Sequence, residues 1–200
     1  MKPTKDRILA AAVQEFSENG FGGARIERIA GAAGANLRML YHYFGNKEQL
    51  YLASLEAVYR DVREAEAKLR LSELAPNAGI RRLAHFTFDY FTSHPEFVGL
   101  LTSENLLHGS HVRQSRIVPE TALPLMDSIR DLLARGARER VFRGGIDVVQ
   151  FFITLHAVCY LHVSNRHTLS SMLQRDLSDP KWLARRRAHV TDVLLRYLAA

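Results

Sequence analysis

Residues 36–50, NLRMLYHYFGNKEQL, constrain this chain more than any other segment. Leu37, Leu40 and Phe44 recur at helical spacing, Gly45 marks a turn, and Asn46 is placed to cap a new helix. A helix of about two turns is not stable by itself in water. The rest of the fold must therefore hold this short helix in place.

The other positions of the short helix carry Arg38, Met39, Tyr41, His42 and Tyr43. Arginine, histidine and tyrosine are the side chains that reach base edges and phosphates in nucleic acids. The segment therefore predicts a DNA-reading helix that a scaffold presents to solvent.

The preceding segments predict that scaffold. Apolar residues at helical spacing indicate a helix over about 5–19, with Thr4 as its N-cap and Gly20 at its end. A second helix is expected over about 25–33, followed by a break at Gly34, with Asn36 capping the short helix. Helix, glycine turn and short polar-faced helix form the helix-turn-helix pattern.

The remainder of the chain also favours helices, and the predicted fold class is all-α. A long helix is expected from Asn46 to about Leu71, which would connect the head to the rest of the chain. Further helices are expected at about 78–93, 95–108, 121–138, 147–165 and 180–199. Asp179 followed by Pro180 is a helix start signal.

Composition sets broad limits on the class of protein. The 200 residues are 47% hydrophobic, which fills a sizeable core, and the formal charge of +6 is compatible with a nucleic-acid partner without requiring one. Cys159 is the single cysteine, so no intrachain disulfide is expected and a cytoplasmic location is the simplest inference. No 18-residue apolar run occurs, so we expect no membrane span.

The first 50 residues resemble the TetR family of bacterial transcriptional regulators. The match runs in order through Ile8-Leu9, Ala12, Phe16, Gly20-Phe21, Ile26, Ile29-Ala30, Ala33-Gly34, Leu40 to Phe44, Lys47-Glu48 and Leu50. The resemblance implies a three-helix helix-turn-helix DNA-binding domain at 1–47. It also implies a helical domain at 48–200 that binds an effector and dimerises.

The resemblance assigns the DNA contacts to the head. Arg38 and His42, with Met39 beside them, are expected to face bases, whereas Tyr41, Tyr43 and Lys47 are expected at phosphates; a plain solvated surface is the alternative. Arg25 stands where the family commonly has a hydroxyl residue, and a charged phosphate contact is expected from it. The full predicted DNA-binding set is Arg25, Asn36, Leu37, Arg38, Met39, Tyr41, His42, Tyr43 and Lys47.

Apolar walls with a few embedded polar groups occur between residues 86 and 160. Such walls describe either a small-molecule pocket or an ordinary core with satisfied histidines. Resemblance to the family favours the pocket. The predicted effector-binding residues are Phe86, Tyr90, Leu101, Glu104, Asn105, His108, Phe151, Leu155 and His156.

Other chemistry is not expected. The nine histidines lack thiolates or paired carboxylates at matching intervals, so neither a metal site nor a cofactor is predicted. Cys159 is expected to be an inert core thiol, and residues 185–187, three consecutive arginines, point in different directions on a helix and cannot form one surface. An enzyme using His156, His108 or Glu104 is the weakest alternative, since no nucleophile–base motif or phosphate-binding glycine loop supports it.

The last two helices have broad apolar faces, and the resemblance implies that they pair with a second copy. One short recognition helix contacts few base pairs, so a twofold dimer on a palindromic operator is expected. The predicted protein is a ligand-responsive transcriptional regulator, most simply a repressor, that binds double-stranded DNA as a homodimer. An effector-independent DNA-binding protein, whose C-terminal domain only dimerises, is the alternative.

Overall fold

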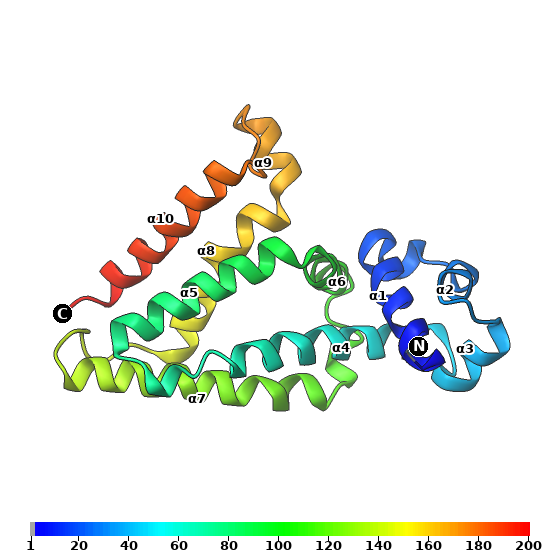
Figure 1. Ribbon diagram of the computed structural model, residues 1–200, viewed down its shortest axis with the longest axis horizontal. Coiled ribbons are helices and arrows are strands. Elements are labelled where there is room, and N and C mark those ends of the chain that lie inside the picture. Colours follow the sequence, from blue (N-terminus) through cyan, green and yellow to red (C-terminus); the bar gives the residue numbers. More distant parts are fainter. Residues whose placement is uncertain (1–2) are drawn as a thin grey trace. The chain divides into compact units, whose positions relative to one another are not determined.

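The computed structural model describes residues 3–200, which fold into helices joined by short turns (Figure 1). The all-α prediction is confirmed. Residues 3–200 contain no β-strand, only an isolated bridge between Phe142 and Ala199. The elements are α1 (Thr4–Gly23), α2 (Ile26–Ala32), α3 (Leu37–Phe44), α4 (Lys47–Ala67), η1 (Leu71–Glu73), α5 (Pro76–Ser93), α6 (Pro95–Leu106), η2 (Val112–Gln114), α7 (Ile117–Arg138), α8 (Val148–Ser164), α9 (Arg166–Met172) and α10 (Pro180–Leu198).

Several predicted boundaries are wrong for local reasons. Thr4 is the first residue of α1 and not its cap, because Pro3 holds the cap position and its carbonyl accepts from Arg7. The helix axis does break at Gly20, whose φ is 63°, but helical turns resume up to Gly23. Similarly, α4 ends at Ala67 and not at Leu71, since Arg70 adopts a left-handed φ of 48°.

Three helices depart from the predicted pattern later in the chain. α7 begins four residues before the expected start at Thr121 and contains Pro124. α5 begins at Pro76, two residues before the expected start at 78, because proline is tolerated in a first helical turn. α9 was not predicted at all. It has no buried residue, and therefore no apolar period that would reveal it.

The chain packs as two compact units. Unit 1 comprises residues 1–62 and 94–121, and unit 2 comprises residues 63–93 and 122–200. These units describe packing and not function. The division into a DNA-binding domain at 1–47 and an effector domain at 48–200 therefore remains a prediction, although α6 and most of α4 pack with the head helices.

The core of unit 1 is built where α1 meets α6 and the helix-turn-helix. Ile8, Ala12 and Phe16 form the buried stripe of α1. α6 crosses α1 closely (Figure 1), because Gly99 has no side chain: a Cβ there would lie 2.4 Å from the Ser17 carbonyl oxygen.

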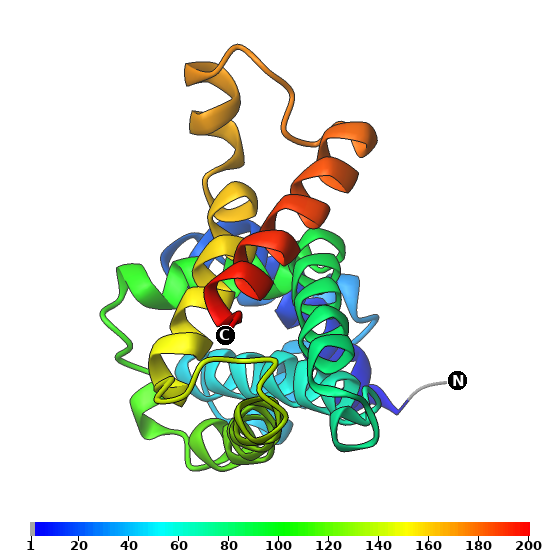
Figure 2. The same cartoon turned by 90° about the vertical axis from the view of Figure 1, so that its left-hand side faces the viewer.

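Unit 2 is organised around α5, which contacts both α8 and α10. The ring of Phe88 on α5 stacks on His162 of α8 at 4.7 Å, and Trp182 of α10 lies 5.7 Å from the same histidine. Asp179 caps α10 as predicted, accepting from the Trp182 amide. α9 continues beyond the end of α8, and the chain then returns to α10 (Figure 2).

No single helix among residues 3–200 is long and apolar enough to cross a bilayer. α8 and α9 reach the required length and composition only when they are joined across a bend of 71°.

Candidate nucleic-acid interface and effector region

The short helix α3 is held by packing and by caps at both ends. Leu40 and Phe44 are buried against the rest of the head, where α1 and α2 both contact α3. The Asn36 side chain accepts from the Met39 amide at 2.9 Å, which satisfies one unpaired amide at the helix start. At the other end Gly45 takes a φ of 76° and its amide donates to the Tyr41 carbonyl. The predicted caps are confirmed, and they explain how eight residues form a stable helix.

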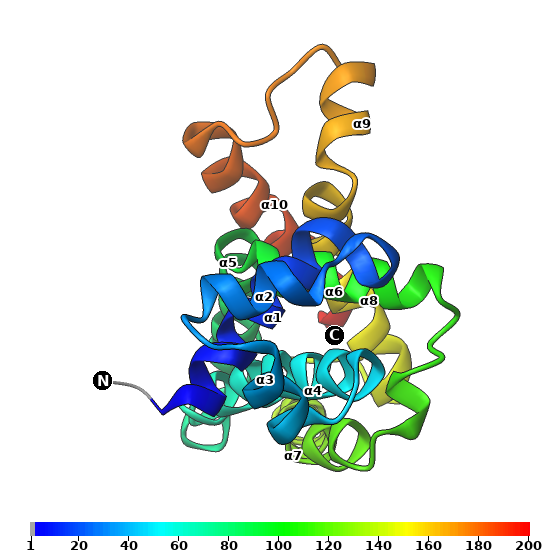
Figure 3. The ribbon, with the colours of Figure 1, turned by 90° about the vertical axis from the view of Figure 1, so that its right-hand side faces the viewer.

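The opposite side of α3 is open. Figure 3 shows α2 and α3, with the turn between them, on the side of unit 1 that faces the viewer. The outward residues are Leu37, Arg38, Tyr41, His42 and Tyr43, while Met39 is half-buried. The rings of His42 and Tyr43 lie 5.3 Å apart, edge to face. The structure thus presents most of the predicted DNA-binding residues on one exposed helix.

Lys47, the first residue of α4, lies at the side of this surface. Its ammonium donates to the Ala24 carbonyl at 2.7 Å and lies 5.0 Å above the Phe21 ring. Burial, together with the positive charge of Arg25, lowers the pKa of Lys47. Two cations held within electrostatic reach of each other form a place where an anion is favoured.

Glu15 on α1 is a positioning residue that the sequence analysis missed. Arg25 is the N-cap of α2 and makes no side-chain cap, but its backbone amide donates to the Glu15 carboxylate at 2.9 Å. The same carboxylate binds Arg28, which lowers the pKa of Glu15. Glu15 thus replaces the missing capping hydroxyl from a distant helix, a contact that no local motif indicates.

A clasp formed by Glu104 and His111 ties the end of α6 to the head within unit 1. The buried Glu104 carboxylate accepts from the amides of His111 and Val112, at 2.7 and 2.9 Å, and contacts the His111 ring at 3.1 Å. The His111 ring packs on Phe21 at 4.7 Å and on Tyr51 at 4.8 Å. Both carboxylate oxygens of Glu104 are therefore engaged inside unit 1.

Ser103 adds a second link between α6 and the head. Its hydroxyl oxygen accepts from the Phe21 amide at 3.4 Å and bonds the Tyr51 hydroxyl at 3.2 Å. Burial raises the pKa of Tyr51 to about 12, so its phenol stays protonated and can donate. Phe21, whose ring lies below the Lys47 ammonium, is thus held by residues of both α4 and α6.

The predicted effector-binding residues divide between the two units. Leu101, Glu104, Asn105 and His108 belong to unit 1. Asn105 is exposed and its amide donates to the Leu101 carbonyl, and His108 is exposed with a left-handed φ of 56°.

The members in unit 2 lie on α5 and α8. Phe151 and Leu155 are buried core residues, and Phe86 lies 5.5 Å from Tyr90. His156 packs on Phe152 at 3.9 Å and donates from Nδ1 to its carbonyl oxygen. Burial lowers the pKa of His156 to about 4.

Two features of unit 2 bear on where a ligand would sit. An open groove of about 600 Å³ follows α5, and Phe86 is the predicted effector residue in its wall; the lining is Leu69, Asn77, Ala78, Arg81, Arg82, His85 and Phe86. Arg63 and Glu66 on α4 form a buried ion pair at 2.5 Å that the sequence analysis missed. Both residues look like ordinary surface positions in a helical sequence, so only the packing reveals them.

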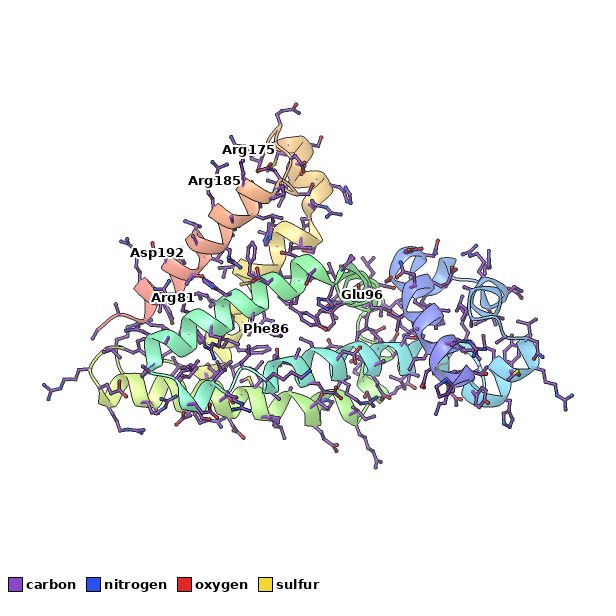
Figure 4. All side chains as sticks on the ribbon, viewed as in Figure 1. Arg81, Phe86, Glu96, Arg175, Arg185 and Asp192 are labelled. Atoms are coloured by element: carbon purple, nitrogen blue, oxygen red, sulfur yellow. The ribbon has the colours of Figure 1, made fainter. Side chains whose placement is uncertain are left out.

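The remaining predictions concern Cys159, the three consecutive arginines at 185–187 and metal binding. Cys159 is buried with its pKa raised to about 12, which fits an inert thiol. The three consecutive arginines diverge as predicted: Arg187 pairs with Asp89, Arg186 donates to the Val158 carbonyl, and Arg185 extends outward from α10 (Figure 4). Across residues 3–200 no group of three or more His, Cys, Asp or Glu side chains is arranged to hold a metal ion.

The exposed reading helix on a three-helix head, followed by a larger helical region, defines a helix-turn-helix transcriptional regulator. Residues 8–54 match the family model for bacterial regulatory proteins of the tetR family, and residues 76–194 match the model for a Tetracyclin repressor-like C-terminal domain. The chain belongs to the TetR family of bacterial transcriptional regulators.

Individual relatives agree with this assignment. The chain is 41% identical to the HTH-type transcriptional repressor NicS of Pseudomonas putida, across 98% of this chain and 92% of that protein. A TetR transcriptional regulator from Chloroflexus aurantiacus has a similar fold, with a TM-score of 0.73, 19% identity and coverage of 98% and 96%. The regulator FadR from Bacillus subtilis, solved in complex with stearoyl-CoA, also shares the fold at a TM-score of 0.66 and 18% identity, with 96% and 98% coverage.

Proposed function

We propose that this regulator is a repressor that binds a palindromic operator as a homodimer and is released by a small molecule. The observation that carries the proposal is the exposed face of α3, capped at both ends and flanked by Lys47 and Arg25. In this proposal the residues that face the bases are Arg38, Met39 and His42. The contacts to phosphate are Arg25, Tyr41, Tyr43 and Lys47, and Asn36 and Leu37 set the start of the helix.

A dimer is supported by the outer faces of α8 and α10. Val149, Ile153 and Leu161 are exposed at four-residue or eight-residue intervals on α8, and Val193 and Tyr197 are exposed on α10. Apolar side chains in such stripes mark a surface that another protein covers. Two copies joined here would supply two recognition helices for two half-sites.

A small-molecule effector is supported by the polar groups in the apolar interior of unit 2, above all His156 and the Arg63–Glu66 pair. The relative NicS is named a transcriptional repressor, which supports the direction of control. Cytoplasmic action on DNA follows from this function as an expectation.

The deciding experiment is selection from a random duplex library at near-physiological salt with excess competitor DNA. An enriched inverted repeat is the expected result, because a twofold dimer reads each half-site with one α3 helix. Folded dimeric protein that enriches no sequence would refute the proposal. Operator affinity that no ligand changes would favour the effector-independent alternative.

Two substitutions separate base reading from phosphate binding on the selected operator. Lys47→Ala should weaken binding to all duplexes and reduce the salt slope by about one unit, since one phosphate contact is lost. Arg38→Ala should instead relax the preference at one base position, at a cost of about 1–3 kcal/mol. Equal, sequence-blind losses from both substitutions would contradict the assignment of Arg38.

A further inference from the structure

Arg63 is an incompletely satisfied cation inside unit 2. Its side chain is 14% exposed, and Nη1 binds the Glu66 carboxylate, but the buried Nε has no hydrogen-bond partner. A buried donor without a partner is unfavourable, because it loses its hydrogen bond to water and gains none in the protein. The free Nε belongs to the edge of the guanidinium that binds carboxylates bidentately.

Two opposing influences act on the pKa of Glu66, the ion-pair partner of Arg63. Burial raises the pKa of Glu66, and the attraction of Arg63 opposes that rise without cancelling it. The carboxylate that pairs with Arg63 is therefore one that the protein interior itself pushes toward the neutral form. A second anion placed on the Nε edge would give this donor the acceptor that it lacks.

An aromatic cluster of His156, Phe91 and Phe152 lies within electrostatic range of Arg63. His156 lies close enough for the charge of Arg63 to contribute to its lowered pKa, and it packs on Phe152 at 3.9 Å and on Phe91 at 5.8 Å. With a pKa of about 4, His156 is neutral at pH 7 and adds no competing positive charge. Thr87, on the turn of α5 before Phe91, has a buried hydroxyl that also lacks a partner.

We infer that Arg63 is the anchor for an anionic effector, a carboxylate on a flat apolar body that lies among Phe91, Phe152 and His156. This inference rests on the proposed function and gives its effector a chemical class. The guanidinium would hold the carboxylate through Nε, and the rings would cover the body of the ligand. The open groove beside Arg81 and Arg82 is a separate surface and is not needed for this site.

The test uses the full-length protein and three probes in isothermal titration calorimetry. Benzoate carries both the charge and the flat body, benzamide keeps the body without the charge, and acetate keeps the charge without the body. Benzoate is expected to bind at least about tenfold more tightly than either of the other two, since each lacks one part of the recognition. Binding of benzamide as tight as that of benzoate would overturn the inference, and so would no detectable binding of benzoate.

Three variants place the site. Arg63→Met combined with Glu66→Met removes the pair together, so that no buried charge is left alone, and should weaken benzoate about ten- to a hundredfold. Glu66→Gln removes the competing carboxylate and should tighten benzoate about threefold or more. Arg138→Met, at the exposed end of α7, is the matched control and should leave the affinity unchanged. Unchanged affinity in the double variant would show that benzoate binds elsewhere and would overturn the assignment to Arg63.

A parallel titration on the selected operator keeps this inference distinct from the proposed function. Benzoate that binds at Arg63 but leaves operator affinity unchanged would retain the anion site and reject its role as effector site. Release from the operator by neutral ligands, with no binding of benzoate, would retain the regulator and reject the anion site.

Discussion

The two units differ in whether their buried polar side chains have hydrogen-bond partners. In unit 1 the buried carboxylate of Glu104 has every oxygen engaged, and the Ser103 hydroxyl bonds both Phe21 and Tyr51. Among the described residues, all the buried side-chain nitrogen and oxygen atoms that lack a partner belong to unit 2: Arg63 Nε, Thr87 Oγ1, both ring nitrogens of His162, and Arg186 Nε. Exposed apolar stripes on α8 and α10 add to this difference.

Under the proposed function, this contrast corresponds to different tasks for the two units. A network with all its members satisfied is rigid, which suits a head that must hold α3 in a fixed orientation. A unit with unpartnered buried groups and uncovered apolar faces is incomplete by itself, which suits a region that takes up a ligand and a second copy.

The strongest effect is expected at the uncovered face of unit 2. Ile153, on α8, is 54% exposed. Ile153→Asp should weaken dimerisation by about 4 kcal/mol, roughly a thousandfold, because the proposed twofold interface would bury the new charge of both copies. Analytical ultracentrifugation measures the change. Leu123→Asp, at a residue of α7 that is 61% exposed, is the control and should dimerise normally. A variant at 153 that remains fully dimeric would place the dimer elsewhere.

The next effect tests the closed network of unit 1. Glu104→Ala should lower the free energy of unfolding by about 3 kcal/mol, because the amides of His111 and Val112 lose their buried acceptor. Thermal unfolding measures the loss, and Asn105→Ala, at an exposed neighbour, should change little. If Glu104 serves the effector instead, its removal would alter ligand affinity at nearly unchanged stability.

The features that could be predicted from the sequence are those that depend on contacts between residues close together in the chain. The caps Asn36, Asn46 and Asp179 were predicted because each bonds an amide three residues ahead. Helix-period patterns likewise predicted most helices, and α9 escaped because it buries nothing.

Contacts between segments far apart in the chain could not be predicted from the sequence. Glu15 reaches Arg25 from another helix, and the clasp of Glu104 on His111 depends on the turn after α6. Even the Arg63–Glu66 pair, three residues apart, looks like any exposed helical ion pair in the sequence, and only its low exposure in the fold gives it significance. The candidate head residues were therefore predictable from a motif, whereas the candidate ligand anchor was not.

A smaller effect, set by pH, tests the unpartnered histidine of unit 2. His162 is 4% exposed, and burial, aided by the charge of Arg186, lowers its pKa to about 4 from an ordinary 6.5. The unfolded chain therefore binds a proton between pH 6.5 and 4 that the folded chain does not. The contribution of His162 to stability is unaffected above pH 6.5 and falls as the pH is lowered, by about 2 kcal/mol at pH 5.

Denaturant titrations at pH 7.5 and pH 5 measure this fall. His162→Phe, which keeps a ring against Phe88, should remove about 2 kcal/mol of it, and the part due to His156 should remain. His167→Gln, at an exposed histidine of α9, should leave the pH dependence as it is. If the free energy of unfolding depends on pH equally in the wild type and in His162→Phe, then burial does not lower the pKa of His162. Water or a ligand would then reach the His162 ring in the folded protein.

The smallest effect concerns the rigidity of α3. Asn36→Ala removes the cap on the Met39 amide and should cost about 1 kcal/mol of stability, with a similar loss in operator affinity because a frayed helix must be ordered on binding. Asn36→Ser keeps a capping oxygen and should restore most of both. This pair separates the two roles open to residue 36. If Asn36 contacts DNA directly, serine should recover the stability but not the operator affinity; if it only caps α3, both should return together.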